Sequence, residues 1–311
     1  MTIAATINYE EIAREISAKI KGTVSQSEEM CHYTTFHVGG PADLFITPVD
    51  FDDLLVTLKI LRNASLPVMT IGNGSNMLVS DLGIRGGVLK LQDEFNTITR
   101  ENNDLIIGAG ANLQRVVNFA AKQSLSGLES TQGIPGTIGG ALVMNAGTDI
   151  GHICDLVHSV DVVTFDGIRH TITKCQLQYG YRNSSLQNMD CVVVSACLRL
   201  VPGEQEAIMN KMNRLREKRT SRQPYGARTA GSTFINPDKI AAGKLLDRSG
   251  CKGMQIGGAA VSDKHANFII THEGVRATDI ITLSEKMQKR VFDVFGVQLK
   301  KEIVMAGDWK F

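Results

Sequence analysis

The run GIPGTIGGALVMNAG at residues 133–147 constrains this chain more than any other segment. It holds five glycines and one proline among small apolar residues, with few polar side chains. Glycine lacks the Cβ that keeps a bulky ligand away from the backbone, so such a run exposes main-chain N–H groups. Successive N–H groups in tight turns bind anions, and a helix that begins near Gly140 would add its positive end. The run predicts a pyrophosphate site; the alternative is a tight structural turn packed on a sheet.

Two common nucleotide-binding motifs are absent from the sequence. There is no G-x-x-x-x-G-K-[ST] run, which argues against a P-loop NTPase. The nearest dinucleotide fingerprint, at residues 108–113, lacks its third glycine and follows several strand-like segments. A second glycine-rich turn, residues 72–76, follows a strand-like segment and precedes the apolar residues 77–79.

Composition limits the function classes. The 311 residues suffice for two or three compact units, and 43% hydrophobic with 21% charged residues is ordinary for a globular protein. A net charge of +1 and 5% aromatic residues give no reason to expect nucleic acid or a membrane as a partner. The chain has neither a secretory signal pattern nor an apolar run of membrane-spanning length, so we expect a cytoplasmic protein.

Cysteine and histidine spacing predicts neither disulfides nor a metal site. The six cysteines form no C-x-x-C pair, and the seven histidines form no H-E-x-x-H. We expect reduced thiols and no bound metal.

Periodicity and turn residues predict a mixed α+β chain. Expected helices cover residues 12–20, 51–63 with Asp50 as N-cap, 113–124, 204–218, 240–249 and 280–294. Expected strands cover residues 34–48 (two strands about a glycine turn), 67–71, 160–165, 168–173, 191–200, 255–261, 268–271 and 297–305. A basic, proline-containing stretch at 219–228 is expected to be a linker.

Three polar residues stand apart as candidates for chemistry. Arg182, at a strand entrance, can hold a carboxylate through two hydrogen bonds; the alternative is a surface arginine. Ser232 follows a glycine and can donate a proton; the alternative is a cap or turn serine. Glu302 lies in a strand-like segment, where the alternative is a solvated residue.

Seven segments in order along residues 33–307 resemble one family, UDP-N-acetylenolpyruvoylglucosamine reductase. They are TTFHVGGPADLFITP, IGNGSNMLVSD, GLESTQGIPGTIGGALVMNAG, GYRNSSL, AGSTFINP, AGKLLDRSGCKGMQIGGAAVSDKHANFI and GVQLKKEIVMAG. The segment between Arg182 and Glu204 has no room for the inserted loop of one structural branch, so the chain resembles the shorter, second type.

The resemblance implies a fold and a division into domains. The fold would be α+β, with a two-subdomain FAD-binding body of the PCMH/vanillyl-alcohol-oxidase type and a smaller α/β C-terminal substrate domain. The subdomains would cover residues 1–90 and 91–218, and the substrate domain residues 219–311, with the last strand able to return to the body.

The resemblance also implies non-covalent FAD, with NADPH as reductant. The cofactor-binding residues would be Gly72, Asn73, Gly74, Ser75, Asn76, Gly133, Ile134, Pro135, Gly136, Thr137, Gly139, Gly140, Asn145 and Gly147. Tyr181 and Asn236 would bind the substrate, UDP-N-acetylglucosamine enolpyruvate.

The implied reaction makes UDP-N-acetylmuramate for peptidoglycan. NADPH would reduce FAD, and flavin N5 would give hydride to C3 of the enolpyruvyl ether. Arg182 and Glu302 would stabilise the enolate-like charge, and Ser232 would protonate C2. We expect a monomer. Two alternatives remain open at this point: another FAD-dependent oxidoreductase of the same fold, or a nucleotide-binding protein without catalysis.

Overall fold

The structure, a computed structural model, describes residues 7–309. These residues divide into two compact units. Unit 1 comprises the residues up to Glu28, Ala42–Gly72 and Arg85–Met212, and unit 2 comprises Glu29–Pro41, Asn73–Ile84 and the residues from Asn213 onward. Both units therefore contain residues from the N-terminal third of the chain.

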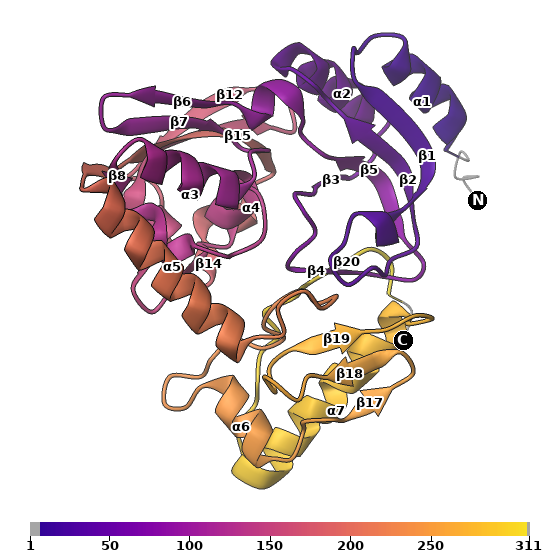
Figure 1. Cartoon of the computed structure of the whole chain (residues 1–311). Helices are drawn as coiled ribbons and strands as arrows, with labels where there is room; N and C mark the ends of the chain where they lie inside the picture. Colours follow the sequence, from indigo (N-terminus) through magenta and orange to yellow (C-terminus); the bar gives the residue numbers. More distant parts are fainter. Residues whose placement is uncertain (1–6, 310–311) are drawn as a thin grey trace. The chain divides into compact units, whose positions relative to one another are not determined.

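The first sheet of unit 1 has the strand order β1-β2-β5-β3 (Figure 1). Its strands are β1 (Thr23–Glu29), β2 (Pro41–Thr47), β5 (Ile84–Leu89) and β3 (Val68–Thr70). Helices α1 (Tyr9–Ser17) and α2 (Phe51–Asn63) both begin at a polar cap: Asn8 accepts from the Glu11 amide, and Asp50 from the Asp53 amide. The predicted helix over residues 51–63 and its cap are confirmed.

The second sheet of unit 1 is antiparallel, with the order β12-β11-β15-β7-β6. Its strands are β12 (Arg169–Thr173), β11 (Val157–Thr164), β15 (Cys191–Arg199), β7 (Asp104–Gly108) and β6 (Ile98–Glu101). Two helices, α3 (Leu113–Lys122) and α4 (Ile138–Val143), follow β7 in the chain, and α4 packs on β7 and β15. Shorter pieces complete the unit: β8 (Leu125–Ser126), β9 (Gly147–Thr148), β10 (Gly151–His152), β13 (Tyr179–Gly180), β14 (Asn183–Ser184) and β16 (Val201–Pro202).

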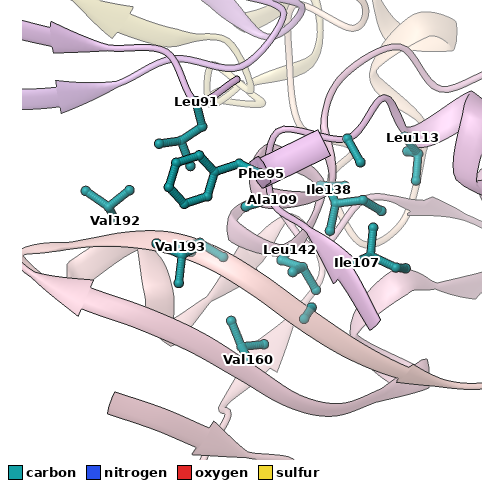
Figure 2. Packing of buried hydrophobic residues seen from close by; sticks show 14 of the residues in the cluster. Leu91, Phe95, Ile107, Ala109, Leu113, Ile138, Leu142, Val160, Val192 and Val193 are labelled. Carbon is teal, nitrogen blue, oxygen red and sulfur yellow. The ribbon is translucent and has the colours of Figure 1, made fainter. Parts of the chain in front are cut away.

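One apolar core fixes the glycine-rich run in unit 1. Figure 2 shows Ile138 and Leu142 of α4 in the same buried cluster as Ile107, Val160 and Val193 of the second sheet. Ile138 and Leu142 are both fully buried, and burying each such side chain stabilises the fold by about 1.5–3 kcal/mol. The glycines of the run can therefore approach their neighbours closely because the isoleucine and leucine between them anchor the helix.

Unit 2 contains a three-stranded antiparallel sheet of β17 (Gln255–Ile256), β18 (Ala259–Val261) and β19 (Ile269–Thr271). α7 (Ala277–Phe295) packs on this sheet and on α6 (Ala242–Arg248), and ends at Gly296, whose φ is +66°. β20 (Val304–Ala306) pairs in parallel with β4 (Met77–Val79). α5 (Gln205–Arg222) precedes the segment that leads to the sheet.

Five element predictions are wrong in part. The strand expected over residues 255–261 is two antiparallel strands, β17 and β18, because Gly257 takes a φ of +51° and turns the backbone. Of the two strands expected over residues 34–48 only β2 forms, because His37 and Gly39 take positive φ and turn the backbone. α5 continues to Arg222, into the expected linker. Val294 is 55% exposed rather than on the buried face of α7. The last strand spans Val304–Ala306 alone, so Glu302 precedes it.

Glu129 provides a stability test of the turn that precedes the glycine run. Its buried carboxylate accepts from Ser126 Oγ (2.6 Å) and the Gly127 amide (3.0 Å), with Lys211 Nζ 3.5 Å away. Burial alone would raise the pKa of Glu129, but these hydrogen bonds and the lysine charge hold the pKa below its usual value. Glu129→Gln should destabilise the protein by about 1–3 kcal/mol at neutral pH.

The pH dependence follows from that lowered pKa. The stabilisation is present above the unfolded pKa and is lost as pH falls through the folded value. Urea unfolding at pH 7 and at decreasing pH should therefore show the gap between wild type and Glu129→Gln closing in acid. The exposed Glu206→Gln is the control. A gap that stays constant with pH would contradict this account.

Candidate functional site

The two glycine-rich turns meet in unit 1 at Gly72 and Thr137. A Cβ built on Gly72 would lie 2.5 Å from Thr137 Oγ1, too close for any side chain. Thr137 is the N-cap of α4, and its hydroxyl accepts from the Gly140 amide. The glycine at position 72 is therefore required by the close approach of the second turn.

Most amides between Gly133 and Gly140 already have acceptors. Those of Ile138 and Gly139 donate to the carbonyls of Ala111 (2.9 Å) and Ala109 (2.8 Å), and that of Gly140 to Thr137 Oγ1. The first turn of α4 therefore has no free N–H group at these three residues, because this turn pairs with the segment after β7 and with Thr137. Within residues 7–309, the amides of Gly136 and Thr137 have no acceptor. The anion-binding capacity of the run lies just before the helix.

Residues 73–76 belong to unit 2 and form a similar turn. Gly74 has a φ of +57°, and a Cβ there would lie 2.1 Å from the Tyr33 carbonyl oxygen. In the part of the chain that the structure describes, the amides of Asn73, Gly74 and Asn76 have no acceptor. This turn therefore also presents backbone donors.

Arg182 sits in a two-residue hairpin loop of unit 1. Strands β13 and β14 pair Gly180 with Asn183, which leaves Tyr181 and Arg182 at the tip. Arg182 has a φ of +56°, a region that residues with a Cβ adopt at a steric cost. Its Nη1 donates to the Gly147 carbonyl (3.2 Å), and its guanidinium lies 5.1 Å from the centre of the Tyr181 ring.

The backbone segments that carry Ser232 and Glu302 pair with each other in unit 2. The Glu302 amide donates to the Thr233 carbonyl (2.9 Å), and Phe234 bridges to Lys301. The Glu302 carbonyl accepts from Asn76 Nδ2 (3.2 Å), so residue 302 is held between two predicted site segments. Ser232 is half-buried, and its hydroxyl has no hydrogen-bond partner among the described residues.

The sequence analysis missed Asn267, which fixes the strand that carries Ser232. Its Oδ1 accepts from the Phe234 amide (3.0 Å) and its Nδ2 donates to the Phe234 carbonyl (2.8 Å). Asn267 is 2% exposed. The Asn267 amide donates to Nδ1 of His265, and burial lowers the pKa of that histidine. The sequence signal for this role was a polar residue, Asn267, between alanine and phenylalanine in the segment KHANFI.

The remaining predicted residues fall into two groups. Asn236 is exposed, and its Oδ1 accepts from the Ala242 amide (2.9 Å) at the start of α6. Tyr181 is exposed at the hairpin tip. Asn145 is buried; its Nδ2 donates to the Gly180 carbonyl and its Oδ1 accepts from the Cys154 amide.

Three further observations concern cysteine reactivity, metal binding and membrane insertion. Burial raises the pKa of the Cys154 thiol to about 12, so this cysteine is protonated and unsuited to nucleophilic attack. Among residues 7–309, no group of three or more histidine, cysteine and carboxylate side chains is arranged to hold a metal ion. No helix in the described part of the chain has the length and apolarity to cross a membrane.

Comparison with known proteins gives two family matches. The family described as UDP-N-acetylenolpyruvoylglucosamine reductase, C-terminal domain, matches residues 223–306. The family described as FAD binding domain matches residues 42–173.

Individual proteins agree with these matches. The UDP-N-acetylenolpyruvoylglucosamine reductase of Clostridium botulinum is 42% identical over 281 residues, covering 90% of this chain and 92% of its own. The crystal structure of the enzyme from Thermus caldophilus has a TM-score of 0.81 at 34% identity, covering 92% of this chain and 99% of its own. A glucose dehydrogenase, Phl p 4.0202, has a TM-score of 0.51 at 14% identity over 63% of this chain and 44% of its own, a likeness of fold alone.

The contact at Gly72 can be tested by substitution. Gly72→Ala should displace Thr137 and weaken FAD binding by tenfold or more, since the two turns can no longer approach each other. In the matched variant Gly180→Ala the new Cβ would meet nothing within 4 Å, so FAD affinity should stay at the wild-type value. FAD affinity is measured by titrating folded apoprotein. Unchanged affinity in Gly72→Ala would contradict the assignment.

Proposed function

Because this chain belongs to the UDP-N-acetylenolpyruvoylglucosamine reductase family, we propose which of its residues carry out that reduction. The chain is an oxidoreductase with FAD as cofactor and NADPH as reductant, and it acts on a small-molecule UDP-sugar. The predictions of family, enzyme class, cofactor and an α+β fold with an FAD-binding body are confirmed.

Gly72 and the turn before α4 are proposed to bind the FAD diphosphate. The close contact of Gly72 with Thr137 and the free amides of Gly136 and Thr137 fit a group that carries negative charge and needs backbone donors. The other proposed cofactor residues are Asn73, Gly74, Ser75, Asn76, Gly133, Ile134, Pro135, Gly139, Gly140 and Gly147. Asn145 is left out of this proposal, because its amide oxygen and nitrogen both bond to backbone. FAD supplies hydride transfer from NADPH to the enolpyruvyl group when it is bound.

Arg182 and Glu302 are proposed to bind the substrate carboxylate. A guanidinium donates two parallel hydrogen bonds to a carboxylate and stabilises the charge that grows there as hydride arrives at C3. Glu302, as the protonated acid, would donate a hydrogen bond to the same carboxylate. Such contacts lower the barrier because they strengthen as charge develops.

Ser232 is proposed to give its proton to C2. An enolate-like carbon is basic enough to take a proton from an alcohol, so no histidine partner is needed. The half-buried serine hydroxyl without a partner among residues 7–309 supports this role. The observation that carries the proposal is the hydrogen bond from the Glu302 amide to the Thr233 carbonyl, which fixes the acid segment beside the serine segment.

Finer points of the proposal concern the whole protein. Tyr181 and Asn236 are proposed to bind UDP-N-acetylglucosamine enolpyruvate. The protein is proposed to be a cytoplasmic monomer, with a substrate domain from residue 219 onward.

Ser232→Ala tests the proton-donor role. Reduction of the flavin by NADPH should keep its wild-type rate, because no proton from Ser232 enters that half-reaction. Reduction of the enolpyruvyl substrate should fall by about 10²- to 10⁴-fold. Stopped-flow absorbance of the flavin measures the two half-reactions separately.

The control is Ser17→Ala, an exposed serine at the end of α1. It should leave both rates unchanged. If both half-reactions of Ser232→Ala slowed equally, or if neither slowed, the proton-donor role would be wrong.

A further inference from the structure

We infer that Asn145 and Gln187 are positioning residues for Arg182, holding the arginine hairpin to the segment that follows α4. The inference rests on the proposed role of Arg182 in binding the substrate carboxylate. It gives Asn145 a task different from the flavin contact that the sequence resemblance implies.

The hairpin needs such a restraint because its own backbone does not favour this shape. A two-residue loop joins β13 to β14, and its second residue, Arg182, has a positive φ. Glycine or asparagine normally occupies such a position, since a Cβ is crowded there. An arginine persists in this conformation only when surrounding contacts over-determine it, and strained residues of this kind gather at functional sites.

Asn145 supplies the buried contact. Its Nδ2 donates to the Gly180 carbonyl (2.7 Å), two residues before Arg182, and its Oδ1 accepts from the Cys154 amide (3.2 Å). Asn145 is 2% exposed, so water does not compete for these bonds. The reverse orientation of the amide would set oxygen against the Gly180 carbonyl and NH₂ against the Cys154 N–H, which only the observed orientation avoids.

The backbone of Cys154 is also held at its carbonyl. Lys174 Nζ donates to the Cys154 carbonyl and to Tyr179 Oη (2.8 Å), and lies 4.4 Å from the centre of the Tyr179 ring. Tyr179 begins the hairpin. Asn145 and Lys174 thus connect one residue, Cys154, to the strand that leads into Arg182.

Gln187 restrains the far side of the loop. Its Nε2 donates to the Arg182 carbonyl (3.2 Å) and to the Val143 carbonyl (2.9 Å). Ser184 Oγ donates to the same Val143 carbonyl (2.8 Å), and Arg182 Nη1 donates to the Gly147 carbonyl (3.2 Å). Three of these four bonds reach residues 143–147, and the fourth joins Gln187 to Arg182 itself, so the loop and the end of the glycine run are held as one piece.

Asn145→Asp removes the donor and leaves the rest in place. The aspartate keeps the size of asparagine and can still accept from Cys154, but in its ionised form it cannot donate to Gly180, so the assay is run at pH 8 and above. FAD content and flavin reduction by NADPH should stay at wild-type values. Reduction of the enolpyruvyl substrate should fall by about 10- to 100-fold, as expected when a reacting group is displaced by about an ångström.

Asn102→Asp is the matched control. Asn145 has a positive φ (+44°), and so has Asn102 (+54°). Asn102 is exposed, in the turn between β6 and β7. It undergoes the same change of charge on the same backbone conformation, and should keep wild-type rates. Gln187→Ala changes an exposed side chain. It should slow reduction of the enolpyruvyl substrate several-fold, and it provides a second test if Asn145→Asp expresses poorly.

A double-mutant cycle separates positioning from general structural damage. In the Arg182→Ala background, where the arginine is gone, Asn145→Asp and Gln187→Ala should cause no further loss. Losses that multiply would overturn the inference, as would a fall in FAD content that accounts for the lost activity, or wild-type rates in both single variants. If Arg182→Ala alone kept the wild-type substrate rate, the proposed role of Arg182 would fail, a result distinct from the others.

Discussion

The close approach of Thr137 to Gly72 is the constraint on which the proposed cofactor site of unit 1 depends. It brings two turns together with no side chain between them, at 2.5 Å from where a Cβ would stand. The approach is possible because Ile138 and Leu142 bury α4 in the core. The turn before the helix is thereby held with the amides of Gly136 and Thr137 unoccupied within residues 7–309. Hydrophobic burial and missing side chains together create a place for an anion.

Much of the fold could be predicted from the sequence, since helix caps and apolar periodicity act locally. Asp50 capping α2 and Gly296 ending α7 are examples. The errors arose where local signals are weak or where tertiary contacts decide. Residues 34–40 have the β-branched residues of a strand but turn at His37 and Gly39. The last strand is short because its partner β4 offers only three residues.

The residue types of the candidate site could be predicted from the sequence, but the hydrogen bonds that hold those residues in place could not. Glycine density indicated backbone donors, and the family resemblance indicated Arg182, Ser232 and Glu302. No sequence pattern shows that the amides of Ile138 and Gly139 already have acceptors, or that Asn267 pairs with the Phe234 peptide. These bonds join residues distant in the sequence, and only the folded chain brings them together.

We propose that main-chain amides of the turn before α4 bind the diphosphate of FAD. Fluorescence titration of the apoprotein with FAD and with riboflavin tests it most directly, because riboflavin has the same ring system without the diphosphate. Two charge-assisted hydrogen bonds contribute about 3 kcal/mol or more, so FAD should bind at least about 100-fold more tightly. Equal affinity for the two flavins would contradict the account.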